Sequence, residues 1–433
     1  MLVCRNGASD FDTSECPCGC YRFHRAEIYG QDRIDNGPYR PVTWLPGVNF
    51  LWNQRNLLIK KFIKNQVMII EIVGSFLPPE GVMVARDDLR KGVIDAETMK
   101  SREDEAVSDL VKRQLSLGLR QVTSGEIRRE YWDMDFWFSF DGIARARFDS
   151  VRIYRNVESW CDLLRIIGPI GFNPKHPFFD DLRFLKGLVG DRAVCMQCIP
   201  SPADLYLAVL LIREADITDI YPDHMALRND ISRTYNKMLQ EFYRLGCRSV
   251  QFDDTACGRL CQDNFTKRLL QGGVDLISLH DDFITLINDS VRGLPVDLET
   301  SLYLSGGDTI VPEWEYIEYP DNIMPKVLKE VKVDKFFLPM ALDNDYQLEI
   351  LRHVPDGKKV VLGLVDAHSP YPEDRSMINQ MVSITQRHIS PDNLSLSPRT
   401  GFKLTHHQDR GLTYEDQWNK LSELQEISET IKI

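Results

Sequence analysis

Short runs of β-branched and aliphatic residues alternate with helical stretches from about residue 67 to the end of the chain. Strands that alternate with helices in this way indicate parallel strands joined by crossover helices. Eight such runs are present, and eight is the number of strands that a closed (β/α)8 barrel, the TIM barrel, needs. The predicted strands are 67–73, 121–125, 193–199, 249–254, 298–304, 335–338, 358–365 and 394–397.

The helical stretches have apolar residues at a spacing of three and four. One lies at 106–115, between the first two predicted strands, and Gly118 follows it as a plausible cap. The stretch 223–245 has the same spacing and places Met225 and Phe242 on one face. We expect crossover helices whose methionines and aromatic residues pack in the core.

Residues 1–66 differ from the rest, because they contain clustered cysteines and prolines without a sustained helical or strand period. Cys16, Cys18 and Cys20 are separated by one residue each, which suits a single tetrahedral zinc ion poorly. We therefore predict an irregular extension over 1–66, with Met68 as an alternative start, and one barrel domain over 67–433. No internal repeat is evident.

The net charge of -12 and the isoelectric point near 5.3 favour small metabolites as ligands. Nucleic acids and anionic membranes attract basic surfaces, so both are excluded as expected partners. No apolar run reaches the roughly 18 residues that span a bilayer, and the N-terminus lacks a signal pattern. We expect a cytoplasmic protein whose ten cysteines are thiols. The sequence does not predict the oligomeric state.

Polar residues follow several predicted strands, at the barrel face where active sites form. Ser75 could hold a carboxylate, although it could simply end its strand. Glu126 ends the second strand, and Asp253 and Asp254 end the fourth. An acid there could bind an amino group or cap a helix. His368 follows the seventh strand, where it could transfer a proton or remain a solvated loop residue.

Together these motifs resemble the catalytic half of cobalamin-independent methionine synthase, and still more its short single-barrel relatives. The resemblance runs from about residue 73 to the C-terminus. It implies that Ser75 binds the homocysteine carboxylate, that Glu126 contacts homocysteine, and that Asp253 binds its amino group. The segment from Asp366, aspartate-alanine-histidine-serine-proline, is the most specific match. The resemblance makes His368, beside Asp366, the proton donor to the departing folate.

The resemblance fails at the zinc ligands. The family's histidine, first cysteine, glutamate and second cysteine fall on Tyr303, Ser305, Pro339 and Thr400. These side chains offer neither thiolate nor imidazole, so we expect no family-type zinc site and no cofactor. A thiol with a pKa of about 8.5 is only a few per cent ionised at pH 7 without the metal.

A metal could still be bound elsewhere. Cys195 and Cys198 are three residues apart in a predicted strand and should face opposite sides. Cys257 and Cys261 have helical spacing and could share a face, but buried thiols more often pack as small apolar groups. Zinc is expected only if the assignment of the ligand positions is wrong.

Three functions remain open. The first is a zinc-free, acid-assisted transfer or rearrangement on a small polar or amino-acid-like metabolite. In it, the hydroxyls of Tyr303, Ser305 and Thr400 would converge where the metal was and bind a substrate oxygen. The second is methyl transfer from a methyltetrahydrofolate to homocysteine, which makes methionine. The third is a catalytically silent metabolite-binding protein. The aromatic segment 131–148 could cover the barrel mouth, pack in the core or form a subunit contact.

Overall fold

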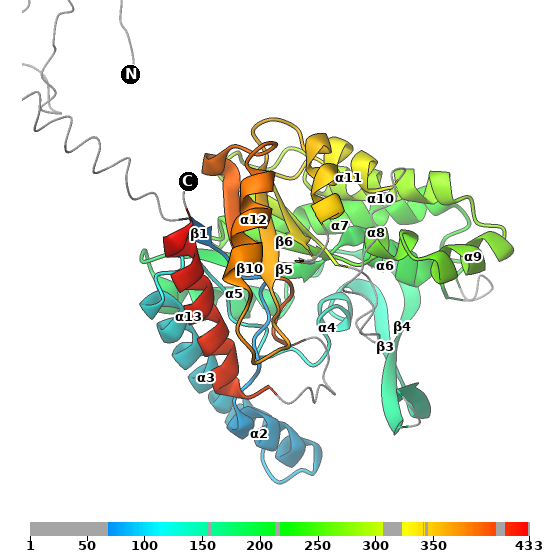
Figure 1. Ribbon diagram of the computed structural model, residues 1–433. Coiled ribbons are helices and arrows are strands. Elements are labelled where there is room, and N and C mark those ends of the chain that lie inside the picture. The colour runs from blue at the N-terminus through cyan, green and yellow to red at the C-terminus, as the bar shows by residue number, and fades with distance from the viewer. Residues whose placement is uncertain are drawn as a thin grey trace, which may run out of the picture. The chain divides into compact units, whose positions relative to one another are not determined.

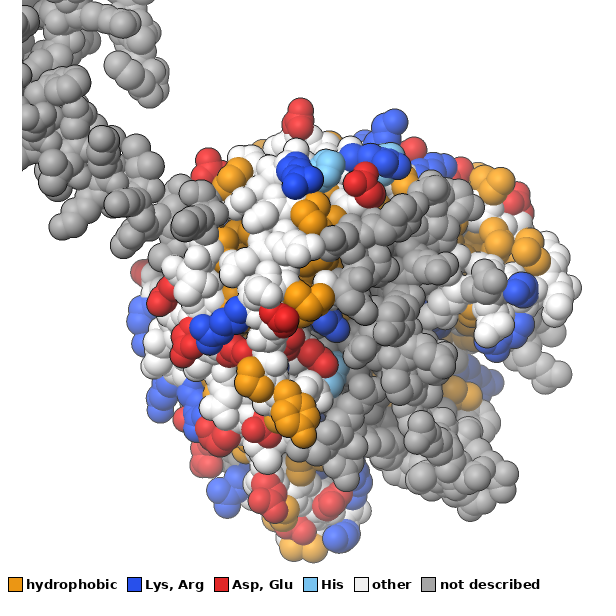
Figure 2. Space-filling model, in the orientation of Figure 1, with side chains coloured by type: hydrophobic (Ala, Val, Ile, Leu, Met, Phe, Trp, Pro, Cys, Tyr) orange, Lys and Arg blue, Asp and Glu red, His pale blue; other side chains and the backbone are white. Residues whose placement is uncertain are grey.

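The computed structural model describes residues 68–154, 157–212, 217–305, 323–340, 342, 345–403 and 412–431. The predicted extension over 1–66, with its cysteine cluster, lies outside these residues. Within the described part, no helix is long and apolar enough to cross a membrane. On the face shown in Figure 2, basic and acidic side chains are interspersed.

Eight parallel strands form a single curved sheet in the order β1-β10-β9-β8-β7-β6-β5-β2, with helices around it (Figure 1). The two ends of this order meet, since Phe76 N donates to Gly125 O (2.9 Å) and Thr123 Oγ1 donates to Gly74 O (3.0 Å). The predicted (β/α)8 fold is confirmed. The strands are β1 (Ile69–Ile70), β2 (Gln121–Val122), β5 (Val194–Pro200), β6 (Ser249–Asp254), β7 (Glu299–Leu304), β8 (Lys335–Pro339), β9 (Lys359–Val365) and β10 (Leu394–Pro398).

Several helices bury an apolar face, among them α3 (Ala96–Ser116), α5 (Phe178–Val189) and α7 (His224–Arg244). Gly118 follows the helix α3 and has a φ of 73°, the left-handed conformation that favours glycine after the end of a helix. In α7, Phe242 is buried as predicted, but Met225 is 56% exposed because it lies in the first turn, beyond the contacting face. The helices are α2 (Glu80–Arg90), α3 (Ala96–Ser116), α4 (Met134–Trp137), α5 (Phe178–Val189), α6 (Pro202–Leu210), α7 (His224–Arg244), α8 (Ala256–Leu260), α9 (Asp263–Gln271), α10 (Leu276–Ser290), α11 (Met324–Glu330), α12 (Arg375–Thr385) and α13 (Tyr414–Thr430); η3 (Asp345–His353) and η4 (Pro391–Asn393) are 3-10 helices.

A long antiparallel hairpin is inserted between α4 and α5. Its strands are β3 (Asp141–Tyr154) and β4 (Val157–Gly171), and the sequence did not predict it. It extends away from the barrel beside α6 (Figure 1). The aromatic segment before it packs inward, with Phe136, Trp137 and Phe140 buried. Core packing is therefore its main role.

A buried ion-pair cluster closes the end of the barrel at which the strands begin. Lys335 Nζ lies 2.6 Å from carboxylate oxygens of both Glu71 and Glu299, and Lys359 lies 2.7 Å from Glu299. Burial alone would raise the pKa of Glu299, but the two lysines lower it to about 2.

We expect Lys335→Met to lower the free energy of unfolding by about 3–5 kcal/mol, because Glu71 then loses its cation and Glu299 keeps only Lys359. Since the pKa of Glu299 is about 2 in the folded chain and 4.5 in the reference state, its stabilisation is complete above pH 4.5 and is lost as the pH falls toward 2. Urea unfolding at several pH values measures both effects. Lys100→Met, which breaks an exposed pair with Asp104, is the control. Equal midpoints for the two variants would contradict this account.

Candidate functional site

Ser75 lies just past β1, against the segment that follows β10. Its hydroxyl donates to Lys403 O (2.7 Å), and its carbonyl accepts from Phe402 N (2.9 Å). A Cβ on Gly401 would overlap Ser75 Oγ, so only glycine permits this approach. The two segments together hold the Ser75 side chain at the barrel mouth.

Glu126 follows β2 in a strained backbone conformation. Its φ is 56°, and within the described residues it is the one non-glycine residue with a positive φ. Such strain is often found at functional sites. Its carboxylate is buried, with Oε2 3.3 Å from a guanidinium nitrogen of Arg129. Arg129 also donates to the carbonyl of Cys198 and stacks 4.6 Å from the Phe178 ring centre.

The two acids at the end of β6 have different surroundings. Asp253 Oδ1 accepts from Gln251 Nε2 (2.7 Å), and burial together with the Glu126 carboxylate raises the pKa of Asp253 well above its usual range. Asp254 is fully buried, and its Oδ1 accepts from Cys257 N (2.9 Å) at the start of α8. Asp253 therefore belongs to the candidate site, and Asp254 to the capping of a helix.

Cys198 joins these acids, and one ligating atom from each of Glu126, Cys198 and Asp253 lies within 4.8 Å of the others. The Cys198 thiol donates to Val73 O (3.4 Å), and burial and the two acids raise its pKa. Cys195 is not part of this group, as its position three residues earlier in β5 predicts. We call Ser75, Glu126 and Asp253 the cradle, with Cys198 against it.

The cradle suits an ammonium ion better than a divalent metal. Arg129 already balances Glu126, and the surroundings of Cys198 favour its neutral thiol, so Asp253 is the group that can supply a further negative charge when a cation binds. A primary ammonium has one positive charge and three donors for these acceptors. A divalent ion would need the thiolate form of Cys198. Burial and the two neighbouring acids oppose the ionisation of this thiol.

The four positions that correspond to family zinc ligands lie at the ends of β7, β8 and β10. Tyr303 is buried and hydrogen-bonds with Ser305, and burial and Asp253 raise its pKa. Pro339 ends β8. Thr400 Oγ1 lies 3.4 Å from His368 Nε2 and donates to Gly401 O (2.9 Å). Three hydroxyls and a proline ring do not fit zinc, so no step is assigned to a metal here.

His368 lies in the loop after β9, with its imidazole side chain only 6% exposed. Asp366 Oδ1 accepts the backbone N–H of His368 (2.8 Å) and lies 3.8 Å from its Nδ1. Asp366 therefore shapes the turn that carries the ring. Thr400 faces the other ring nitrogen, which joins the β9 loop to the β10 loop.

The C-terminal helix fixes this loop from behind. Glu373 Oε1 accepts from Asp366 N (2.9 Å) and pairs with Lys420 Nζ (2.8 Å) of α13. Glu423, also on α13, accepts from Glu373 N (2.8 Å). Lys420 and Glu373 are both buried at their side chains, so the His368 loop rests on a rigid support.

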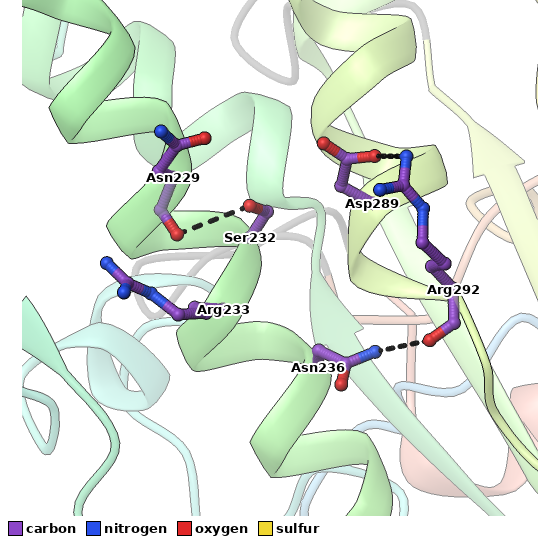
Figure 3. Close-up of a pocket in the computed structure, with 6 residues that line it drawn as sticks. All are labelled: Asn229, Ser232, Arg233, Asn236, Asp289 and Arg292. Atoms are coloured by element: carbon purple, nitrogen blue, oxygen red, sulfur yellow. Dashed lines mark hydrogen bonds and ion pairs between the residues drawn. The ribbon is translucent and has the colours of Figure 1, made fainter.

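Two cavities lie apart from the cradle. One of about 390 Å³ opens between α7 and α10 (Figure 3), where Arg292 pairs with Asp289 and Asn236 donates to Arg292 O (3.0 Å). Its polar groups thus bind one another. The other, of about 810 Å³, lies between α4, β4 and α6 and is mostly apolar. Burial raises the pKa of Asp133 in its wall to about 6.

The model of the family "Cobalamin-independent synthase, Catalytic domain" matches residues 314–412, which include Pro339, His368 and Thr400. The chain is 30% identical over 360 residues to the uncharacterized protein YxjG of Bacillus subtilis, and the match covers 83% of this chain and 93% of that protein. The chain belongs to the cobalamin-independent methionine synthase family. It has the family's short, single-barrel form.

Solved structures from the methionine synthase family agree with this assignment. A candidate vitamin-B12-independent methionine synthase from Listeria monocytogenes is 28% identical, with a TM-score of 0.66 over 84% of this chain and 98% of its own. A B12-independent methionine synthase from Shewanella sp. W3-18-1, in complex with selenomethionine, is 19% identical. Its TM-score is 0.57 over 83% of this chain and 97% of its own, which shows the shared fold.

The sequence predicted that Ser75, Glu126 and Asp253 lie on one face of the barrel. In the structure, Arg129 pairs with Glu126, and Gln251 donates to Asp253. Ser75 donates to Lys403, whose ammonium donates to the carbonyl of Arg129. Ser305 hydrogen-bonds with Tyr303, whereas Thr400 contacts His368. Lys403 and Cys198 were missed as members of the site. The alternation of side chains along the predicted strand could have placed Cys198 in the site. No sequence pattern predicts that Lys403 lies there.

We expect Gly401→Ala to weaken ligand binding at the cradle by roughly 10-fold or more, since the loss of a hydrogen bond to a charged ligand group costs about 1.5–3 kcal/mol. The new methyl group must displace the Ser75 hydroxyl. Titration calorimetry with L-methionine measures the loss. Gly187→Ala is the control, because a Cβ there meets no atom within 4 Å. Wild-type affinity in Gly401→Ala would show that Ser75 does not bind the ligand.

Proposed function

We propose that this barrel binds a small amino-acid-like metabolite and performs a zinc-free, acid-assisted group transfer or rearrangement on it. The observation that carries the proposal is the convergence of Glu126 and Asp253, from the ends of two different strands, within 4.8 Å of each other. Glu126 and Asp253 have one neighbouring cation between them, Arg129, so a ligand ammonium can supply the second positive charge. The selenomethionine complex of the Shewanella protein supports an amino-acid ligand.

In a transfer, the ligand ammonium would lie against Glu126 and Asp253. Its carboxylate would accept the hydrogen bond that the Ser75 hydroxyl gives to Lys403 O in the unliganded chain. The acceptor's lone pair forms the new bond as the bond from the transferred group to its donor breaks. His368 would give a proton to the leaving oxygen or nitrogen of the donor, and the proton of the acceptor goes to solvent. Asp366 and Thr400 would keep the imidazole in place.

The absence of family-type ligands at Tyr303, Ser305, Pro339 and Thr400 supports the zinc-free form of the reaction. An uncoordinated homocysteine thiol is a weak nucleophile at neutral pH. Methyl transfer to homocysteine is favoured instead by the names of relatives such as the methionine synthase of Pyrococcus furiosus, which is 21% identical. That function requires stoichiometric zinc and methionine as the product.

The binding half of the proposal is tested by titration calorimetry with L-methionine, 3-(methylthio)propylamine and 4-(methylthio)butanoate. The first carries both charged groups, the second lacks the carboxylate, and the third lacks the amino group. We expect L-methionine to bind at least 10-fold more tightly than either analogue, given about 1.5–3 kcal/mol for each charged hydrogen bond. Equal affinity for the acid without an amino group would refute the cradle.

The catalytic half is tested by incubating the metal-free protein with a small-molecule cell extract and following products by mass spectrometry. Products that require wild-type protein and disappear with His368→Asn support the transfer. Methionine formed from homocysteine and methyltetrahydrofolate after zinc is added back to the protein would establish the competing function. Saturable binding with no product would identify a silent metabolite-binding protein.

A further inference from the structure

Lys403 differs from the two other enclosed lysines of the described chain. Lys335 and Lys420 each lie within 4 Å of two carboxylates. Among the described residues, Lys403 makes no ion pair, and its Nζ donates to the carbonyl of Arg129 (2.7 Å). An ammonium has three donors, so two remain for a ligand. An enclosed cation of this kind indicates a site for an anion.

The position of Lys403 connects it to the cradle from both sides. Its carbonyl accepts the Ser75 hydroxyl (2.7 Å), and its ammonium holds the backbone of Arg129, whose side chain pairs with Glu126 (3.3 Å). The contacts thus run from Ser75 through Lys403 and Arg129 to Glu126. An anion held by Ser75 would lie against the backbone of Lys403, and the ammonium of Lys403 would be the nearby cation on the same residue that could reach it.

We infer that Lys403 is a second anchor for the ligand carboxylate, beside Ser75, and that it makes the cradle selective for zwitterionic α-amino acids over simple amines. The inference rests on the proposed function and adds a residue and a selectivity to it. Glu126 and Asp253 hold the positive end of such a ligand, and Ser75 and Lys403 the negative end. The chain then has a matched partner for each charge of an amino acid.

The electrostatic surroundings of Lys403 agree with this role. Burial and the neighbouring Arg86 and Arg129 lower its pKa to about 8, against the opposing effect of Glu126 and Asp135. The cation therefore destabilises the unliganded fold at pH 7. Because its pKa is lower in the folded chain than in the reference state, this cost is present below pH 8 and disappears as the pH rises from 8 toward 10.5.

The test compares the full-length wild type with Lys403→Met and Lys403→Arg, titrated with L-methionine and with 3-(methylthio)propylamine. We expect Lys403→Met to bind L-methionine roughly 10- to 150-fold more weakly, the range for a charged hydrogen bond, and to bind the amine as the wild type does. Lys403→Arg should restore most of the affinity for L-methionine.

Thermal unfolding of the unliganded proteins separates this role from a structural one. Lys403→Met should melt at or above the wild-type temperature at pH 7, since it removes an unpaired cation, whereas a structural lysine would leave a less stable protein. Equal loss of both ligands, or unchanged L-methionine binding in a folded Lys403→Met, would overturn the inference. If the wild type bound neither ligand, the proposed function itself would fail.

Discussion

Asp253→Asn is expected to weaken L-methionine binding by roughly 30- to several-thousand-fold, because removal of one member of a buried charge pair costs about 2–5 kcal/mol. Arg129 already balances Glu126, so Asp253 supplies the further negative charge that holds the ligand ammonium once binding has released the proton of Asp253. The substitution preserves shape and removes only that charge. Titration calorimetry measures the change directly.

Proton release gives this variant a second readout. Burial and Glu126 raise the pKa of Asp253 in the unliganded protein, and an arriving ammonium lowers it again. Binding therefore releases protons, and the affinity should rise with pH on the acid side. Calorimetry in buffers of different ionisation enthalpy detects this release in the wild type, and we expect its loss in Asp253→Asn.

Asp254→Asn is the matched control. Asp254 is the next residue of β6, but its carboxylate accepts from Cys257 N (2.9 Å) outside the cradle. We expect its loss to lower stability and to leave L-methionine affinity almost unchanged. If both variants lost affinity equally, the acids would act through the fold and the cradle would be wrong.

His368→Asn should reduce turnover by roughly 10²- to 10⁴-fold, the usual contribution of a positioned general acid. The ring has Thr400 at one nitrogen and Asp366 near the other, and asparagine can keep a polar contact but cannot supply the proton. L-methionine affinity should be unchanged, because the cradle residues remain. The assay follows the product that the wild type forms in the metabolite extract.

His388→Asn is the control for this prediction, since His388 is an exposed histidine after α12. It should have wild-type turnover. If His368→Asn or His368→Ala formed the same product at the wild-type rate, the role of His368 as the general acid would be excluded. Loss of binding along with turnover would instead show that the ring shapes the site.

The barrel could be predicted from sequence because its strands are buried on both faces. Runs such as 249–254 and 358–365 are apolar and bounded by polar turns, and both match strands of the structure closely. The hairpin β3–β4 could not, since its strands are only partly buried. Ile167 is 61% exposed, and Arg145 pairs with Asp162 across the two strands, so no continuous apolar pattern marks them.

The site could be predicted only where the fold dictates position. Parallel strands end on one face, which places Ser75, Glu126 and Asp253 together before any contact is known. The sequence does not show which of the adjacent acids Asp253 and Asp254 faces the site. The structure shows it, because Asp254 accepts from Cys257 N at the start of α8 and so lies outside the cradle. Lys403 lies after β10 and contacts Ser75 and Arg129, which are far from it in sequence. The strand pattern does not predict these contacts.

The most direct test of the central claim is to measure the zinc content of the purified full-length chain and its binding of L-methionine before and after chelator treatment. A parallel sample with Cys16→Ser, Cys18→Ser and Cys20→Ser excludes metal held by the N-terminal cysteines. The account predicts that zinc is well below one per chain while L-methionine still binds at the cradle. Stoichiometric zinc in both samples, with L-methionine binding lost on chelation, would contradict it.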